Sequence, residues 1–482
     1  MFGRAKYYAG VSALLGVGFG PGAAARHADD LGTFDGDVCG ATGINDRGAV
    51  VGSCRLADGG FVTAYWAPGA APVRLPRLVE DRPCAVLGID NGGAAVGNCE
   101  FGNVGEAAAV RWRATPEEAP ERLQPREQDV QSRARLVNQR GVVAGSSRDA
   151  AGARHAVVWK WSTTAPTDLP ELDQTSCWVS DMSNDDDPVI VGTCELRHGG
   201  SVGVRWTPDG ASYAVEPLAL PPSTTHCWPA DVNGQHVVAG TCQLLDGSLE
   251  AVRWRANGTE ALVLSRVDAR TVHPMLTVVD MNESGVIAGN YITNAGLTRA
   301  FTWSPVDDPA ADQRATDLGS LGGFSTYAFG IADDGEIVGT AQNERGHDEA
   351  FAWSPRTSEM QGLGNLGGFN SMVTAKSDGG QVAGVSETDA GYSHAFRATE
   401  GAPPPPPAGC SRDHEAREVH AAQSARAIPH TTRKADSYTS KYDNLDIDEI
   451  LRNKRLLRNY TKCLMDKGEC SPEGPALKDD PE

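Results

Sequence analysis

Short apolar segments alternate with polar turns along most of this sequence. One stretch shows the pattern clearly: turn residues at 43–48 (Gly-Ile-Asn-Asp-Arg-Gly) precede the β-branched segment Ala49–Gly52, and Val62–Trp66 and Val73–Leu75 follow. Asn, Asp and Gly tolerate the positive φ angles of tight hairpin turns, whereas β-branched residues favour strands. We therefore expect four strands in each unit of about 47 residues.

This unit occurs eight times. A glycine closes one apolar strand in each copy, at Gly52, Gly97, Gly145, Gly192, Gly240, Gly289, Gly339 and Gly384. A tryptophan follows 14 or 15 residues later in seven copies, at Trp66, Trp112, Trp159, Trp206, Trp254, Trp303 and Trp353, and the eighth copy has Ala398 there. Four-stranded repeats of this length are typical of propeller blades. The sequence predicts an all-β fold, an eight-repeat β-propeller. A β-solenoid is the alternative, although its repeats are usually shorter.

The last copy lacks a segment for its fourth strand. After Phe396 the chain continues only with Arg-Ala-Thr-Glu before a proline run. The segment Asp30–Phe34 stands before the first copy and is similar to Asp317–Gly319, the segment that follows Trp303. We expect this N-terminal segment to pair with the last repeat, which would close the ring and remove an exposed sheet edge.

Paired cysteines occur in four of the copies and in no other copy. The pairs are Cys39 and Cys54, Cys84 and Cys99, Cys177 and Cys194, and Cys227 and Cys242. The midpoint of each pair falls in the predicted turn, so the two cysteines should face each other across a hairpin. Directly opposed residues lie roughly 4.5–5.5 Å apart at Cα, within disulfide range. The sequence therefore predicts four disulfides within repeats. A metal site is a weaker interpretation, because the sequence has no Cys-x-x-Cys motif.

Composition changes along the chain and suggests its division. Arg4 and Lys6 precede an apolar, small-residue run and Ala23–Ala25, the pattern of a cleaved secretory signal at residues 1–25. Pro403–Pro407 is a stiff spacer. We expect a repeat domain at 30–399, a polar linker at 400–436 that carries an unpaired Cys410, and a separate segment at 437–482. Export to an oxidising compartment agrees with the cysteine pairs.

The repeats resemble the HAF repeats of extracellular bacterial proteins. The resemblance covers roughly residues 30–399 and rests on Gly330–Gly339, Ala350–Trp353, the His394-Ala395-Phe396 triplet and the linking segment Asp317–Gly323. Copies 1 to 5 depart from the triplet. The resemblance implies an extracellular, propeller-like protein and implies no activity.

The C-terminal segment differs from the repeats. Apolar residues of Leu445–Leu451 and Leu456–Leu464 recur at helical spacing, so we expect a short helical fragment, in which Cys463 and Cys470 could form a local bridge. Lys441–Asn444, Asp446–Leu451 and Cys463–Gly474 resemble the start of insect chemosensory proteins. That resemblance implies a secreted helical carrier of hydrophobic ligands, with Cys463 and Cys470 as its first disulfide. The segment corresponds only to the first part of that family, so we expect an incomplete carrier.

The remaining chemistry gives no catalytic motif. Acidic groups at Asp185–Asp187, Asp307–Asp308 and Asp333–Asp334 read as solvated hairpin turns, and no serine stands in a Gly-x-Ser-x-Gly elbow. The repeated tryptophan is interpreted as a wedge between blades, with a sugar-stacking platform as the alternative.

These patterns lead to one function prediction and one alternative. The formal net charge of −20 disfavours nucleic acid, and no stretch is apolar enough to span a membrane. We expect a secreted, monomeric binding or scaffolding protein that is not an enzyme and needs no cofactor or metal. Its partner would be an unknown protein, a glycan or a small hydrophobic ligand. The alternative is a carrier of small hydrophobic ligands through the C-terminal segment.

Overall fold

The computed structural model describes residues 26–36, 38–102, 106–113, 118–172, 176–197, 200–264, 267, 275–306 and 314–400. The chain divides into two compact units, Met1–Pro404 and Pro405–Glu482, and every described residue belongs to the first unit. The described part is all-β and contains no helix. It therefore has no helix long and apolar enough to cross a membrane.

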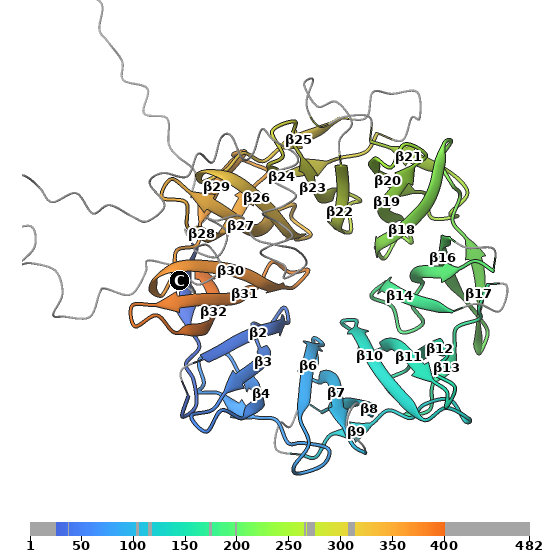
Figure 1. Cartoon of the computed structure of the whole chain (residues 1–482), viewed down its shortest axis with the longest axis horizontal. Coiled ribbons are helices and arrows are strands. Elements are labelled where there is room, and N and C mark those ends of the chain that lie inside the picture. The colour runs from blue at the N-terminus through green and yellow to red at the C-terminus, as the bar shows by residue number, and fades with distance from the viewer. Residues whose placement is uncertain are drawn as a thin grey trace, which may run out of the picture. The chain divides into compact units, whose positions relative to one another are not determined.

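The strands form four-stranded antiparallel sets that follow one another around a ring (Figure 1). The first strands of the sets are β2 (Val38–Ile44), β6 (Cys84–Ile89), β10 (Gln131–Val137), β14 (Cys177–Met182), β18 (Thr224–Val232), β22 (Met275–Met281), β26 (Gly322–Ile331) and β30 (Gly367–Lys376). The second strands are β3 (Val50–Arg55), β7 (Ala95–Glu100), β11 (Val143–Arg148), β15 (Ile190–Glu195), β19 (Val238–Leu244), β23 (Ile287–Ile292), β27 (Ile337–Asn343) and β31 (Val382–Thr388).

The outer strands complete each set. The third strands are β4 (Phe61–Trp66), β8 (Ala107–Trp112), β12 (Arg154–Trp159), β16 (Ser201–Asp209), β20 (Leu249–Trp254), β24 (Thr298–Trp303), β28 (Asp348–Ser354) and β32 (Ser393–Glu400). The fourth strands are β5 (Val73–Arg74), β9 (Glu121–Arg122), β13 (Thr167–Asp168), β17 (Ser212–Pro217), β21 (Ala261–Val263), β25 (Ala315–Asp317) and β29 (Glu359–Gly362). A single parallel pairing, Leu249 with Met275, joins β18–β21 and β22–β25 into one eight-stranded sheet.

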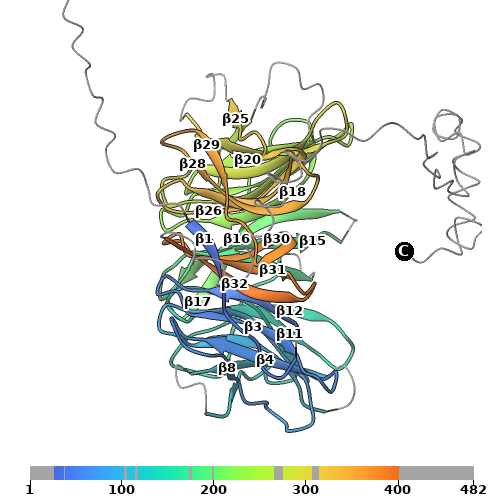
Figure 2. The ribbon, with the colours of Figure 1, turned by 90° about the vertical axis from the view of Figure 1, so that its left-hand side faces the viewer.

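The N-terminal strand supplies the fourth strand of the last set. β1 (Arg26–Asp30) pairs antiparallel with β32, from Arg26 opposite Glu400 to Asp30 opposite Phe396, and the two lie side by side in Figure 2. The prediction placed this strand at 30–34, four residues too late. Leu31 is not in a strand, but its N–H donates to the carbonyl of Ala395 (3.0 Å). The pairing removes the free edge that β32 would otherwise expose.

The repeated glycine is explained by a β-bulge in the first strand of each set. The register shifts there, for example between Ala41 and Gly43 opposite Gly52. A Cβ on Gly52 would overlap the carbonyl oxygen of Gly40, and the equivalent carbonyl blocks each of the other repeat glycines. Because a backbone atom occupies the space, a larger residue could fit only if the bulge moved.

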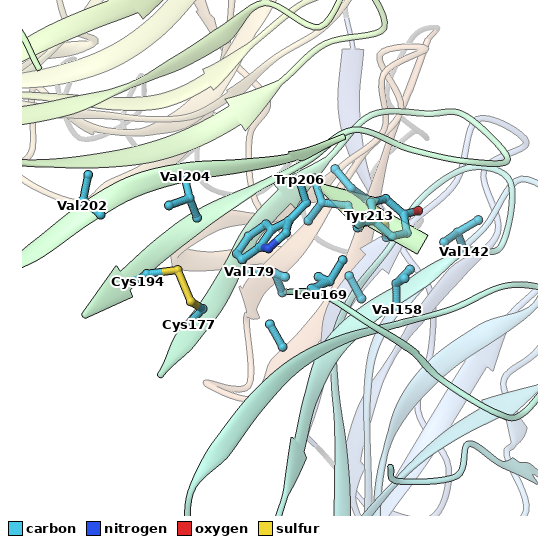
Figure 3. Packing of buried hydrophobic residues seen from close by; sticks show 14 residues of the cluster. Val142, Val158, Leu169, Cys177, Val179, Cys194, Val202, Val204, Trp206 and Tyr213 are labelled. Carbon is cyan, nitrogen blue, oxygen red and sulfur yellow. A yellow bond between two sulfur atoms is a disulfide. The ribbon is translucent and has the colours of Figure 1, made fainter. Parts of the chain in front are cut away.

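The core lies between neighbouring sheets. All seven repeat tryptophans are at most 4% exposed, which favours the wedge over the sugar platform. Figure 3 shows Trp206 against Leu169 and Val158 of the preceding sheet, near the Cys177–Cys194 disulfide. Its indole N–H donates to the carbonyl of Pro170 (2.8 Å), and the indoles of Trp112, Trp159 and Trp254 donate in the same way to Pro76, Gln124 and Ala219, so these four wedges also tie a blade to the connection before it.

Candidate functional site

A cavity of about 220 Å³ lies where the first strands of all the sets end. Its lining comes from residues far apart in the sequence, from Ile44 on β2 to Lys376 on β30. It is rich in carboxylates: Asp181, Asp231, Asp280, Glu283, Asp333 and Asp378 line it, with Lys376 as the one basic side chain in that lining. We call this the axial cavity.

Three of these aspartates occupy the same position in consecutive sets, directly after the bulge. Bulges re-aim side chains and are frequent next to functional sites. Each carboxylate accepts from a backbone N–H of the next set: Val232 to Asp181 (3.0 Å), Met281 to Asp231 (2.9 Å) and Ile331 to Asp280 (2.7 Å). The same position holds Gly43, Gly88 and Gly330 in other sets. The fold therefore tolerates a missing side chain there.

Lys376 compensates the negative charge of Asp280, the last of the three aspartates. Its ammonium lies 2.7 Å from the Asp280 carboxylate and 3.7 Å from Asp378, and it donates to the carbonyl of Ile331 (2.6 Å). Asp378 also reaches across the cavity, where its carboxylate accepts from the side-chain amides of Gln139 (2.5 Å) and Asn184 (2.8 Å). Side chains from non-adjacent sets thus meet at the axis.

A second layer of polar contacts runs around the same end. Asparagine side chains donate to carbonyls of the next set: Asn45 to Asp90 (2.9 Å), Asn138 to Ser183 (2.9 Å) and Asn282 to Ala332 (3.2 Å). Between the last set and the first, the N–H of Gly379 donates to Asp46 (2.8 Å). These bonds satisfy buried polar groups and hold the rim of the axial cavity in place.

The three aspartates differ in their protonation. Burial raises the pKa of Asp181 to about 7, although the N–H groups of Val232 and Met182 oppose this change. Burial, together with the neighbouring carboxylates of Asp181 and Asp280, raises the pKa of Asp231 well above its usual value.

Asp280 behaves in the opposite way. Burial alone would raise its pKa, but the Lys376 ammonium and a hydrogen bond from Asp231 hold it below its usual value. The pKa of Lys376 is correspondingly raised by Asp280 and Asp378 despite its burial. Asp231 therefore holds a proton more tightly than Asp280, which keeps its charge, while Asp181 titrates near pH 7. This arrangement can hold a cation or exchange a proton within the cavity.

Sequence reasoning missed these residues. Asp181, Asp231 and Asp280 stand about 50 residues apart in the sequence, and the packing of consecutive sets brings them together. The available signal was the alignment of repeat positions, where Asp precedes an apolar residue and Ser or Asn in three successive copies. The structure holds no group of three or more His, Cys, Asp or Glu able to bind a metal within the ranges it describes.

The cysteines lie elsewhere, at directly opposed positions on the first two strands of their sets. The structure contains the disulfides Cys39–Cys54, Cys84–Cys99, Cys177–Cys194 and Cys227–Cys242, with Cα atoms 4.0–4.1 Å apart. This spacing is slightly closer than the 4.5–5.5 Å expected for opposed residues. The same positions hold the buried pairs Ser132 and Ser147, and Ser371 and Ser386, in two other sets.

The other sequence-predicted groups are dispersed. Asp185 and Asp333 lie in turns at the ends of first strands, as expected for hairpin turns, and Asp333 also lines the axial cavity. Asp307–Asp308, Cys410, Cys463 and Cys470 lie outside the described residues, as do the predicted signal and helical segments.

Comparison with known proteins locates one family in this chain. Residues 438–481 match the insect pheromone-binding family, A10/OS-D. Viresin of Heliothis virescens is 53% identical over 38 residues, which make up 8% of this chain and 86% of that protein. Through this segment the chain belongs to the insect pheromone-binding family A10/OS-D.

Longer relatives match the same region. Ejaculatory bulb-specific protein 3 of Drosophila melanogaster is 63% identical over 43 residues, 9% of this chain and 34% of the relative. Allergen Tha p 1 of Thaumetopoea pityocampa is 49% identical over 47 residues, 10% of this chain and 37% of the relative. The chain thus spans about a third of the length of these relatives.

The solved structures similar to this chain include a β-propeller domain. The β-propeller domain of the Trilobed protease from Pyrococcus furiosus is 10% identical, with a TM-score of 0.44 over 71% of this chain and 98% of that domain. A post-proline cleaving enzyme from Rickettsia typhi is 9% identical (TM-score 0.46, 70% and 56% covered), and a puromycin hydrolase is 14% identical (0.43, 70% and 56%). At this identity the likeness concerns the fold alone.

These neighbours correct one prediction. We expected from the sequence a protein that is not an enzyme, and that exclusion was wrong, because proteins similar in fold to this chain include a puromycin hydrolase and prolyl endopeptidases. A fold of this kind does not rule out catalysis.

Proposed function

We propose that this is a secreted binding protein in which residues 26–400 form an eight-bladed propeller that takes a small organic cation in the axial cavity. The observation that carries this proposal is the placement of Asp181, Asp231 and Asp280 on consecutive first strands, with Lys376 as the one base in the lining. A buried carboxylate is stabilised by a paired positive charge. Lys376 already provides this for Asp280. Asp181 has no such partner among the described ion pairs, so a bound amine or guanidinium would fill that role.

The cavity volume sets the size of this ligand. About 220 Å³ corresponds to several water molecules at about 30 Å³ each. A short diamine or a guanidinium fits this space, whereas a peptide or a sugar chain does not. Because the pKa of Asp181 is about 7, the cation competes with a proton, and its affinity should increase as the pH rises through 7.

Isothermal titration calorimetry with putrescine and with agmatine tests this proposal on the full chain at pH 6 and pH 8. We expect binding at pH 8 that weakens about tenfold at pH 6 and is lost in Asp181→Asn. The exposed Asp81 lies outside the cavity lining, so Asp81→Asn removes the same charge as a matched control and should bind like the wild type. Equal affinity at both pH values, or equal loss in both variants, would refute a site at Asp181.

The other parts of the chain complete the proposal. Residues 1–25 act as an export signal, and the HAF-type repeats begin near residue 30, after β1. Residues 400–436 act as a linker. The protein is an extracellular monomer. The paired cysteines and the secreted nature of the resembled insect family support export. A reporter fused after residue 30 should leave the cell, and deletion of residues 1–25 should retain it.

A second function is favoured by the match of residues 438–481 to a pheromone-binding family. We propose that this segment, with a Cys463–Cys470 bridge, contributes to binding of small hydrophobic ligands. Displacement of a fluorescent fatty ligand from the full chain, lost on removal of residues 437–482, tests this role. The absence of displacement would leave the propeller as the sole binding part.

A further inference from the structure

A second, larger pocket lies away from the axial carboxylates and has the opposite charge. Its volume is about 720 Å³, and β6, β7, β10, β11, β12, β14 and β15 contribute to its lining. Arg133, Arg135 and Arg154 line it, against the single carboxylate of Glu195. This is a local positive site on a chain whose formal net charge is −20. We call it the arginine pocket.

The three guanidinium groups are exposed and make no hydrogen bond, ion pair or ring contact with the described residues. Arg133 and Arg135 flank the buried Ala134, with Arg135 as the extra residue of the β-bulge, and both side chains are exposed. Arg154 begins β12, the second strand along from β10 in the same sheet. Arginine presents several N–H donors in a rigid fork that matches a carboxylate or a sulfate. Three guanidinium groups without a protein partner around one pocket are suited to an anionic ligand.

The fold does not require these arginines. At the position of Arg133, opposite the second strand, other sets have Gly40, Trp178, Thr277 and Met372. The repeat therefore fixes the buried neighbours and leaves this exposed position free to vary. Residues that a fold does not constrain are available for recognition.

An apolar surface completes the pocket. Trp178 on β14 is 38% exposed and Leu87 on β6 is 37% exposed, and both line it. Trp178 is flanked by the buried Cys177 and Val179. The disulfide of Cys177 with Cys194 fixes the backbone that carries the indole ring. An exposed indole on a rigid strand offers a flat face for a ring-shaped ligand.

We propose that the arginine pocket binds an acidic saccharide, a chain of sugar rings that carry carboxylate or sulfate groups. Arg133 and Arg135 lie two residues apart on β10, so their Cα atoms are separated by at most roughly 7 Å. Successive charges on a sugar chain are separated in a comparable way, whereas a phosphate concentrates its charge at one point. A sugar ring packs its apolar face on Trp178 while its anionic groups reach the guanidinium groups. The rigid rings lose little conformational entropy when they bind.

Calorimetry on the full chain tests this proposal with an oligogalacturonate hexamer, a heparin-derived hexasaccharide, neutral maltohexaose and a phosphopeptide. The first two probes distinguish carboxylate from sulfate as the source of the charge. We expect at least one of them to bind, with an affinity that falls as salt is added, and maltohexaose not to bind. Arg133→Ser with Arg135→Ser should weaken this binding at least tenfold, and Trp178→Ala should also weaken it.

A matched control removes two exposed arginines outside the pocket, as Arg345→Ser with Arg356→Ser. This variant has the same net charge as the pocket variant and should bind like the wild type. The proposal is overturned if neither acidic saccharide binds, if the two double variants weaken binding equally, or if the phosphopeptide binds in place of the saccharides.

Discussion

The substitution Asp181→Asn should change how the stability of the protein depends on pH. The folded-state pKa of Asp181 is about 7, against an ordinary value of 3.8. Between pH 3.8 and pH 7 the folded protein therefore binds more protons than the unfolded chain. Since the free energy of unfolding falls with pH wherever the folded state binds more protons, this contribution is present at low pH and is lost as the pH rises through 7.

The size of the effect follows from the two pKa values. For a single carboxyl with these values, linkage gives a loss of about 3 kcal/mol in the free energy of unfolding between pH 5 and pH 8. The charged groups that face Asp181 do not reverse this fall in stability with pH. The pKa values of Asp231 and Asp378 are also raised, so these groups change stability in the same direction. The lowered pKa of Asp280 affects stability below about pH 5, and the raised pKa of Lys376 affects it above about pH 8.

Asparagine imitates the protonated side chain. Its carbonyl oxygen can accept from the N–H of Val232, as the carboxyl oxygen of Asp181 does. We therefore expect the variant to match the wild type at pH 5 and to exceed it by about 3 kcal/mol at pH 8. Urea unfolding followed by tryptophan fluorescence at several pH values measures the difference.

Asp81→Asn serves as the control for removing one negative charge from the acidic chain. It should not show a stability difference that grows between pH 5 and pH 8. Parallel curves for Asp181→Asn and the wild type, or a wild type that gains stability relative to the variant as the pH rises, would refute a titrating carboxyl in the axial cavity.

Three further changes test the architecture. Ser371→Cys with Ser386→Cys places thiols at opposed positions and should form a fifth disulfide. Without reductant, this disulfide should raise the melting temperature by a few degrees. Closing a 15-residue loop stabilises by about 3 kcal/mol, from which the loss of the serine hydrogen bonds is subtracted. Free thiols found by mass spectrometry would contradict the pairing of Ser371 with Ser386. Gly97→Ala should cost about 2 kcal/mol or more in urea unfolding, because its methyl group meets the Ala85 carbonyl; a neutral effect would show that the bulge adapts. Deletion of residues 26–30 should lower the melting temperature and promote self-association through the exposed edge of β32, and a stable monomer by light scattering would argue against closure by β1.

The repeat could be predicted from the sequence because each copy is subject to the same packing constraints. Glycine recurs where a carbonyl occupies the space of its Cβ, and tryptophan recurs where one sheet packs on the next. The disulfide bonds were predictable for a related reason, since a hairpin places residues equidistant from its turn opposite each other, as Cys39 is placed opposite Cys54.

Other features could not be obtained in this way. The closing strand Arg26–Asp30 is polar and has no strand signal of its own; it is extended because β32 offers it a free edge. The prediction therefore placed the strand at Asp30–Phe34, the segment that is similar to Asp317–Gly319. The axial carboxylates and the arginine pocket depend on positions that differ between copies, where the repeat gives no guidance and only the assembled ring brings the residues together.

The most direct test of the strand register within the repeats is peptide mapping by mass spectrometry of the full-length protein without reductant. We expect peptides that join Cys39 to Cys54, Cys84 to Cys99, Cys177 to Cys194 and Cys227 to Cys242. Free thiols at these positions, or links between cysteines of different repeats, would contradict it.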